Sequence, residues 1–381
     1  MSGGRILLRI FSHGKSHISR SFSSVQTKSK LKTNPISGAR TVFNGVDSKT
    51  MFAAQNIPLP ELAPGEILAK VRLASICMSD VHTITGHRIE PTPSVLGHEA
   101  VVEVIDHRRP ESNLAIGDRL TFSVADCCGN CEFCLKGLNQ KCVKLFKYGH
   151  AKLSDGSGYN GCYATHIILR RGTHVVKIPD VISDRCAAPI NCSLATTMAA
   201  MEHVPKIKNG RAFVQLHFVS MVLKKFIAPE RVYNVQNLSI GSVPFHSTML
   251  SGKRQNEVLH EETNKIDVVV EVCGVASVVN DGFRMLKPGG IYLFLGMVHP
   301  HSQLNITGEQ IIRKCLTIQG IHNYAPRHLD QAVQFLAKTI RRYPYEEVMG
   351  PTYDLPDLPA AMKLATGKQY SRVLVKPNMV N

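Results

Sequence analysis

Short runs of alternating apolar and polar residues, separated by proline and glycine, fill the chain between Thr41 and Asp126. Residues 65–76 (GEILAKVRLASI) and 98–105 (HEAVVEVI) are the clearest of them, and the second run is rich in β-branched side chains. Such runs are typical of β-strands. Residues 158–180 show a similar pattern and predict two more strands. The first half of the chain is therefore predicted to be a mostly β domain.

The second half alternates between apolar runs and helical patterns, which predicts a parallel sheet of the doubly wound kind. The predicted strands are residues 211–215, 231–236, 267–274, 291–298 and 316–324. The predicted helices are residues 194–204, with a start near Ser193, residues 277–290, which close with Pro-Gly-Gly, and residues 327–340. A last strand at residues 370–377 is predicted to return to the β domain.

Composition fits a globular protein of two domains, because 381 residues with a 44% hydrophobic share can form two sizeable cores. No run approaches the eighteen uninterrupted apolar residues of a membrane-spanning helix, so no membrane partner is expected. The net charge of +16 is concentrated at the start of the chain, where residues 1–46 hold eight Lys or Arg and no acid. The remainder is only mildly basic, so a nucleic-acid partner is not expected.

The leader itself has the composition of a mitochondrial presequence. Apolar and basic residues recur at roughly helical spacing over residues 5–22, serine is frequent and acids are absent. Arg20-Ser21-Phe22-Ser23 resembles a matrix-processing site with cleavage after Phe22. Arg9 interrupts the apolar stretch, so a secretory signal fits poorly. We expect residues 1–32 to direct mitochondrial import; the alternative is a disordered basic tail on a cytoplasmic protein.

The densest chemical motif is CGNCEFCLKGLNQKC at residues 128–142. Glycines at 129 and 137 permit tight turns, so one small lobe can close four thiolates around a tetrahedral zinc ion. A shell made only of sulfur leaves no open position, and this zinc is therefore predicted to be structural. Free buried thiols are the alternative, while disulfides fit less well with an odd total of eleven cysteines. The predicted ligands are Cys128, Cys131, Cys134 and Cys142.

A second candidate metal site is divided between distant segments. Cys77 in CMSDVH and His98 in LGHEA supply a thiolate and an imidazole, but a catalytic zinc needs three protein ligands and an open position. Cys192 in INCSLATT is the best third candidate because it lies between the β domain and the helical residues that follow. Cys186 is the rival, although it occurs in a polar connection, SDRCAAP.

The order of these motifs, CxSDxH, GHE, CGxCxxCxxGxxxxC and then NCS, resembles that of zinc-dependent alcohol dehydrogenases of the medium-chain dehydrogenase/reductase superfamily. The similarity covers nearly the whole chain after the leader. It implies a GroES-like catalytic domain, residues 33–192 with the zinc lobe at 127–142, an inserted Rossmann-type domain, residues 193–324, and a return to the catalytic domain at residues 325–381.

The resemblance also implies roles for individual residues. Cys77, His98 and Cys192 would bind the catalytic zinc, Asp80 would orient His98, and Glu99 would be an outer or transient ligand. Ser79 and His82 resemble a proton relay, through which the proton of the alcohol would reach solvent. Met78 replaces the small or polar residue usual at its position. The implied reaction is hydride transfer between an alcohol or polyol and NAD or NADP.

The nucleotide-binding segment departs from this family. A GxGxxG turn should follow residues 211–215, yet no glycine occurs between Gly210 and Gly241. Without that turn the backbone cannot approach a pyrophosphate closely. Gln236 stands where an acidic residue would grip the ribose, so neither NAD nor NADP is selected. Gly274 and Gly296 are predicted to end strands near the nicotinamide, with ordinary turn glycines as the alternative.

Two functions therefore follow from the sequence. The first is a zinc-dependent oxidoreductase with two zinc ions per chain, a small-molecule alcohol or carbonyl substrate and, by resemblance, a homo-oligomeric state. NYAPRHL at residues 323–329 is similar to the polyol, threonine and phosphonate-associated branch. The alternative is a zinc-stabilised protein of this fold that has lost cofactor binding and acts as a non-catalytic scaffold or regulatory subunit.

The leader yields a direct test. A fusion of residues 1–40 to a fluorescent reporter should reach mitochondria, because the segment combines an apolar face with positive charge and lacks acids. Replacing Arg5 and Arg9 by Glu in the same fusion should abolish import. A diffuse cytosolic signal from the unchanged fusion would show that the leader is only a basic tail.

Overall fold

The computed structural model describes residues 37–110, 112–204, 211–215, 233–234, 263–272, 274–276, 279–298, 302–367 and 369–378, and of residues 211–215 and 233–234 only the backbone. The predicted leader therefore lies outside the described residues. So do most of the segment without glycine and Gln236 at its end.

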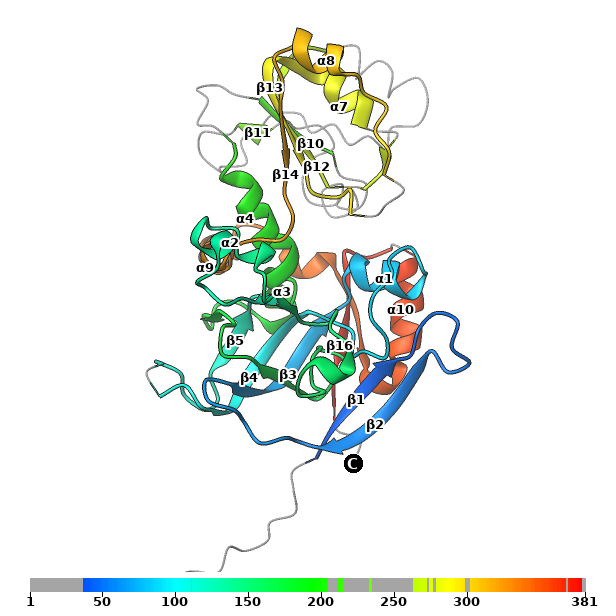
Figure 1. Cartoon of the computed structure of the whole chain (residues 1–381), viewed down its shortest axis with the longest axis vertical. Helices are drawn as coiled ribbons and strands as arrows, with labels where there is room; N and C mark the ends of the chain where they lie inside the picture. Colours follow the sequence, from blue (N-terminus) through cyan, green and yellow to red (C-terminus); the bar gives the residue numbers. More distant parts are fainter. Residues whose placement is uncertain are drawn as a thin grey trace, which may run out of the picture. The chain divides into compact units, whose positions relative to one another are not determined.

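A seven-stranded sheet forms the body of the β domain (Figure 1). Its order is β15-β16-β3-β4-β5-β9, and β8 pairs with β3. The strands are β3 (Ile67–Ser75), β4 (Glu99–His107), β5 (Arg119–Phe122), β8 (His166–Leu169), β9 (Val175–Lys177), β15 (Met349–Asp354) and β16 (Arg372–Lys376). Because β16 pairs antiparallel with β3, the predicted return of the last strand to this domain is confirmed.

The sheet is buried along its centre. Seven of the nine side chains of β3 are buried, so the strand is covered on both faces rather than on one. One cover is α10 (Leu358–Thr366), whose Leu358, Ala361 and Met362 belong to the main apolar core. The hairpin of β1 (Ser37–Phe43) and β2 (Phe52–Pro58) adds Phe43 to the same core.

Short elements carry the candidate ligands around this sheet. The helix α1 (Met78–Ile84) follows β3, and a two-stranded ribbon of β6 (Ala125–Asp126) and β7 (Phe146–Lys147) flanks the cysteine lobe. The remaining short helices are α2 (Glu132–Leu135), η1 (Asn139–Lys141), η2 (Leu153–Asp155), α3 (Asp184–Ala187), η3 (Ile190–Leu194), α8 (Gly308–Arg313), η5 (Tyr345–Val348) and η6 (Leu355–Asp357).

A second sheet has the order β11-β10-β12-β13-β14. It contains β10 (Arg211–Gln215), β11 (Tyr233–Asn234), β12 (Ile266–Glu271), β13 (Leu286–Phe294) and β14 (Thr317–Gly320). The pairs β10·β12, β12·β13 and β13·β14 are all parallel, as predicted. The expected second strand is different, because β11 pairs antiparallel with β10 over two residues only. It is therefore not the parallel partner that a βαβ unit requires.

The helix predicted at residues 277–290 is shorter than expected. Helix α7 covers Val279–Met285, and Leu286 already pairs with Ile266 in the sheet. The next pair is Val268 with Ile291, so five steps along β13 match two along β12. The Pro-Gly-Gly sequence is thus a bulge inside β13 rather than a helix stop, and Gly289 has a φ of 76° there. Burial of Leu286 explains the early end of the helix.

Two helices pack together beside η3. Helix α9 (Pro326–Thr339) buries His328, Leu329, Ala332, Val333 and Leu336, and it contacts α4 (Ala195–Met201). Both helices were predicted from their patterns. The prediction that Cys186 lies in a polar connection is wrong. This residue lies in α3 and is buried in the same apolar cluster as the side chains of α9. Within the described part of the chain, no helix is long and apolar enough to span a bilayer.

A surface ion pair joins α4 to α9. Both carboxylate oxygens of Glu202 accept from Arg327, at 3.0 and 2.7 Å, and His328 Nε2 lies 2.9 Å from Glu202 Oε1. The Arg327 hydrogen bond is the main reason that the pKa of Glu202 falls to about 2. The stabilisation is therefore complete above the ordinary value of 4.5 and is lost as pH falls from there towards 2.

We expect Glu202→Gln to lower the free energy of unfolding by about 0.5–1 kcal/mol at neutral pH, since the pair is partly exposed to solvent. The difference from the unchanged protein should shrink below pH 4.5 as Glu202 becomes protonated in the unfolded chain. Urea denaturation at several pH values measures it. The exposed Glu347→Gln is the control, and a difference independent of pH would contradict the ion-pair account.

Candidate metal centres

The four cysteines of the lobe converge in space. Their Sγ atoms lie within 4.8 Å of one another. Cys142 Sγ is 3.5 Å from Cys128 Sγ and 3.9 Å from Cys131 Sγ. Two thiolates on one tetrahedral zinc are about 3.7 Å apart, because each Zn–S bond is ~2.3 Å long. The predicted set, with Cys134 as its fourth member, therefore fits a zinc ion.

Turns and amide donors shape this lobe. Gly129 and Gly137 have φ values of 74° and 76°, in the left-handed region that favours glycine. The turns let backbone amides point at sulfur: the N–H groups of Cys128 and Lys144 donate to Cys142 Sγ at 3.2 and 3.3 Å. Such amide donors are the usual support of a thiolate ligand.

Amide contacts and burial give the thiols of this lobe different pKa values. The backbone N–H groups of Cys134 and Val143 lower the pKa of Cys131 to about 6. Burial raises the pKa of Cys134 to about 12. Without a cation the buried sulfur would therefore stay protonated beside a thiolate. Four thiolates at this spacing need a metal to balance their charge.

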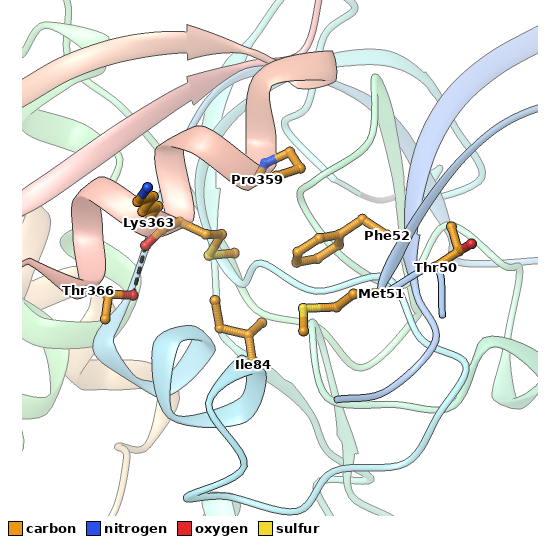
Figure 2. A pocket seen from close by; sticks show the side chains of 8 residues that line it. Thr50, Met51, Phe52, Ile84, Pro359, Lys363 and Thr366 are labelled. Carbon is orange, nitrogen blue, oxygen red and sulfur yellow. Dashed lines mark hydrogen bonds between the residues drawn. The ribbon is translucent and has the colours of Figure 1, made fainter. Parts of the chain in front are cut away.

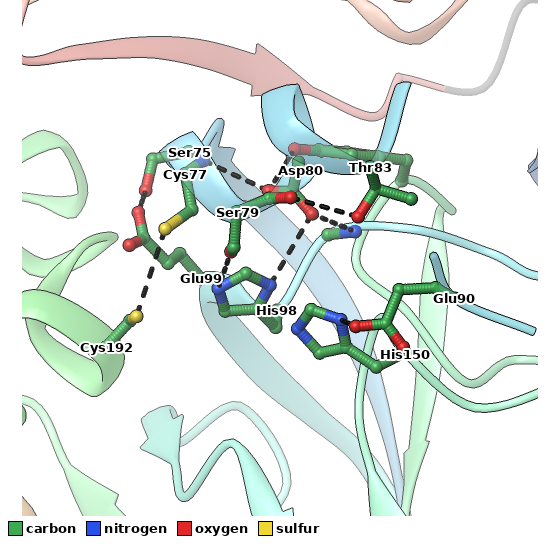
Figure 3. A network of polar contacts seen from close by, with 12 residues as sticks. Ser75, Cys77, Ser79, Asp80, Thr83, Glu90, His98, Glu99, His150 and Cys192 are labelled. Carbon is green, nitrogen blue, oxygen red and sulfur yellow. Dashed lines mark hydrogen bonds and ion pairs between the residues drawn. The ribbon is translucent and has the colours of Figure 1, made fainter. Parts of the chain in front are cut away.

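The second ligand set also comes together, although 115 residues separate Cys77 from Cys192. Their Sγ atoms are 4.0 Å apart, and ligand atoms of His98 and Glu99 lie within 4.8 Å of them and of each other (Figure 3). Cys186, the rival third ligand, belongs to no such group among the described residues. Of the two candidates, the structure brings Cys192 to the site.

Electrostatics favour a thiolate at Cys77. It is the residue before α1 and is buried. The contact with Cys192 Sγ holds the pKa of Cys77 well below its usual range; burial opposes this shift, and a hydrogen bond with His98 adds to it. A buried thiolate between a second thiol and an imidazole is a donor set that suits zinc.

Asp80 holds this site together from behind. Its Oδ1 lies 3.5 Å from His98 Nδ1 and accepts from the Gly97 N–H, while its Oδ2 accepts from the Cys77 N–H and the Tyr163 hydroxyl, both at 3.0 Å. Since His98 Nδ1 faces this carboxylate, Nε2 is the nitrogen left for a metal. The orienting role predicted for Asp80 agrees with this geometry.

Glu99 is engaged elsewhere. Its two oxygens accept from Arg372 at 2.7 and 2.9 Å, and Oε2 also accepts from Ser75 at 2.5 Å. All of these groups lie inside the sheet, where Glu99 is fully buried. Because the Arg372 pair already satisfies the carboxylate, Glu99 would have to leave it to reach a metal. The position fits an outer ligand. Arg372 was not predicted as a site residue, although an arginine inside a predicted apolar strand is itself a signal.

The segment of Cys192 is fixed by a buried amide. Asn191 Nδ2 donates to the carbonyls of His98 and Phe122, at 2.8 and 2.9 Å. The Tyr324 hydroxyl donates to the Asn191 carbonyl. These bonds fasten η3, which has π-helical geometry, to the edge of β4 and β5. Cys192 is thereby brought to the ligands of the β domain.

The proposed relay residues lie on α1. Ser79 Oγ is 3.4 Å from His98 Nε2, so it borders the point where a metal would be bound. His82 lies three positions further along, on the same side of the helix. Its ring is 5.9 Å from that of His87, centroid to centroid. Both relay side chains are half-buried.

Gly274 and Gly296 are adjacent, at the ends of the parallel strands β12 and β13. A Cβ on Gly274 would be 2.7 Å from the Gly296 carbonyl oxygen, so two backbones meet where only glycine fits. Their N–H groups donate to the buried Glu271 at 2.6 and 3.1 Å. The two glycines are therefore needed for this close approach of the backbones, and both N–H groups are already bound to Glu271.

A second buried pair borders His98 and was not predicted. The His150 ring lies 4.9 Å from the His98 ring, centroid to centroid, and His150 Nδ1 is 3.1 Å from Glu90 Oε1 (Figure 3). Glu90 also pairs with Arg88 at 2.5 Å. No motif contains these residues, so only the fold places them at the site.

The described residues also line an apolar pocket of about 390 Å³ at the other end of α1 (Figure 2). Met51, Phe52, Ile84 and Met362 form its walls, and Lys363 supplies the charge at its rim. It contains none of the predicted ligands.

Comparison with known protein families gives two matches along the chain. The sequence profile of the alcohol dehydrogenase GroES-like domain matches residues 63–180, and that of the zinc-binding dehydrogenase matches residues 247–338. Together they match more than half of the chain. The protein belongs to the zinc-dependent alcohol dehydrogenase family of the medium-chain dehydrogenase/reductase superfamily, and the predicted resemblance is confirmed.

Individual relatives agree with this class. The chain is 28% identical to the L-threonine 3-dehydrogenase of Chelativorans sp. over 70% of its own length and 79% of the relative's. An alcohol dehydrogenase from Thermotoga maritima matches with a TM-score of 0.76 at 20% identity, over 90% of this chain and all of the other. A putative zinc-binding dehydrogenase from Sinorhizobium meliloti, bound to NADP, has a TM-score of 0.71 at 21% identity, with the same coverage. At these identities the two structures establish the fold.

The two ligand sets predict different consequences of losing a cysteine. Cys131→Ala should release zinc from the lobe and lower Tm by about 10 °C, because binding energy at a structural site is folding energy. Cys77→Ala should release the other zinc and leave Tm nearly unchanged. Metal analysis and thermal unfolding of each purified variant measure this, with two zinc ions expected in the unchanged protein. Equal destabilisation by both changes would mean that the roles are assigned wrongly.

Proposed function

We propose that this protein is a zinc-dependent oxidoreductase that transfers a hydride between an alcohol or polyol and NAD or NADP. The observation that carries the proposal is the convergence of Cys77, His98 and Cys192, with Asp80 behind the imidazole and the Ser79 hydroxyl beside it. Three protein ligands with no fourth committed side chain are the pattern of a catalytic zinc site, whereas the cysteine lobe is closed.

Each residue then has a task. Zinc, when bound, would supply a Lewis acid that makes an alcohol proton acidic near neutral pH. Asp80 keeps His98 Nδ1 occupied and so directs Nε2 to the metal. Ser79 is placed to accept the alcohol proton and pass it towards His82, because an imidazole nitrogen can both accept and release a proton. Glu99, held by Arg372, lies behind the thiolates as an outer ligand, and burial raises its pKa to about 7.

Family membership supports the nicotinamide cofactor, and a neighbour of the same fold carries NADP. Gly274 and Gly296 follow the parallel strands β12 and β13, at the edge where such cofactors bind in this type of sheet. The predicted lack of a glycine turn concerns residues outside the described part of the chain. No described feature favours the non-catalytic alternative.

The L-threonine 3-dehydrogenase relative supports a substrate in which the reacting alcohol is secondary and carries further polar groups. We further propose two zinc ions per chain, one at each ligand set, and a homo-oligomer of the kind common among similar proteins. Import through the leader would place this activity in mitochondria.

Turnover tests the proposal. Zinc-loaded protein should reduce NAD or NADP with a secondary alcohol or polyol, and Ser79→Ala should lower kcat roughly 100-fold, since proton transfer by a positioned group contributes about that much. Ser154→Ala, at an exposed position, is the control. Calorimetric titration with NADH and NADPH separates binding from chemistry. If neither nucleotide binds, the scaffold or regulatory alternative replaces the enzyme.

A further inference from the structure

Lys147 is an unusual residue beside the proposed catalytic site. It ends β7, where it pairs with Ala125, and it lies between the buried Phe146 and Tyr148. Its own side chain is half-buried. Among the residues that the structure describes, its ammonium group has neither a hydrogen bond nor an ion pair. A cation kept partly out of water without a partner costs stability, so such a group usually serves a ligand.

The surroundings of Lys147 are positive. Burial, and after it the charge of Arg88, lowers the pKa of the ammonium group. Lys141 adds a third cation, and its Nζ donates to His322 Nδ1 at 2.8 Å. Burial and these same three cations lower the pKa of His322 to about 4, so it accepts this bond as a neutral ring. The charge of Glu90 also acts on Lys147, but its carboxylate already pairs with Arg88 and His150.

This positive region adjoins the ligand set. The His150 N–H donates to the Lys147 carbonyl at 3.2 Å, and the His150 ring is 4.9 Å from that of His98. The charges of Cys192 and Cys77 raise the pKa of Lys147, against the larger effects of burial and Arg88. Bound zinc would cancel the charge of the two thiolates. Lys147 would then remain an unpaired positive charge beside the ligand set.

We propose that Lys147 is the specificity-determining residue of the substrate site and that it binds an anionic group, carboxylate or phosphate, on the alcohol that is oxidised. This inference rests on the proposed function and narrows its substrate class to acidic alcohols. A lysine ammonium is a compact point charge with three donors, which accommodates either anion. Arg88 and Lys141 would raise the local concentration of such substrates without touching them.

Matched substrate pairs test this assignment. Propylene glycol and lactate differ by a carboxylate, and glycerol and glycerol phosphate differ by a phosphate. The unchanged protein should prefer the acidic member of at least one pair, and the pair identifies the anion. In Lys147→Met, KM for that acidic alcohol should rise about 10- to 100-fold, the range expected for a lost charged hydrogen bond, with kcat and the neutral member little changed. Lys147→Arg should retain most of the preference.

A binding experiment makes this test independent of turnover. Propionate and inorganic phosphate, titrated calorimetrically into the zinc-loaded protein, should bind more weakly to Lys147→Met by a similar factor. Lys152→Met removes an exposed lysine and is the control. If no alcohol is oxidised but anion affinity still depends on Lys147, the proposed function fails and the anion site stands. If alcohols are oxidised and Lys147→Met changes neither KM nor anion affinity, the inference is wrong.

Discussion

The arrangement of the candidate catalytic site depends on one buried carboxylate. Asp80 accepts hydrogen bonds from the Cys77 N–H, the Gly97 N–H and the Tyr163 hydroxyl, and it faces His98 Nδ1. It thereby joins the start of α1 to the start of β4 and to the segment before β8. A buried carboxylate is tolerated only when such donors satisfy it. Removing it would free both ligands at once.

The two ligand sets are built in different ways. The lobe at residues 128–142 assembles its four sulfurs within fifteen positions, and turns at two glycines bring them together. The other set needs a helix start, a strand start and a π-helical turn that Asn191 fastens to the sheet. The first arrangement is local and closed. The second is assembled by tertiary structure, and one of its four converging residues, Glu99, is also paired with Arg372.

Charge around the second set is unevenly compensated. Glu99 pairs with Arg372, and Glu90 is shared by Arg88 and His150. Lys147 has no such partner among the described residues. Neutral pairs of this kind hold the site in place, whereas an unpaired cation beside it is available for a ligand. The difference separates residues that maintain the geometry from a residue that selects what enters.

Sequence alone determined the features that depend on short-range spacing. The cysteine lobe, most strands and the helix at Pro326–Thr339 follow from periodicity and turn residues. It also supplied Cys77, His98 and Cys192, through the order of motifs. Tertiary structure decided between Cys192 and Cys186, and it ended α7 early because Leu286 is buried in the sheet. Only the tertiary structure revealed that Arg372 pairs with Glu99 and that Lys147 lies beside the site, because contacts between residues far apart in the chain leave no periodic signal.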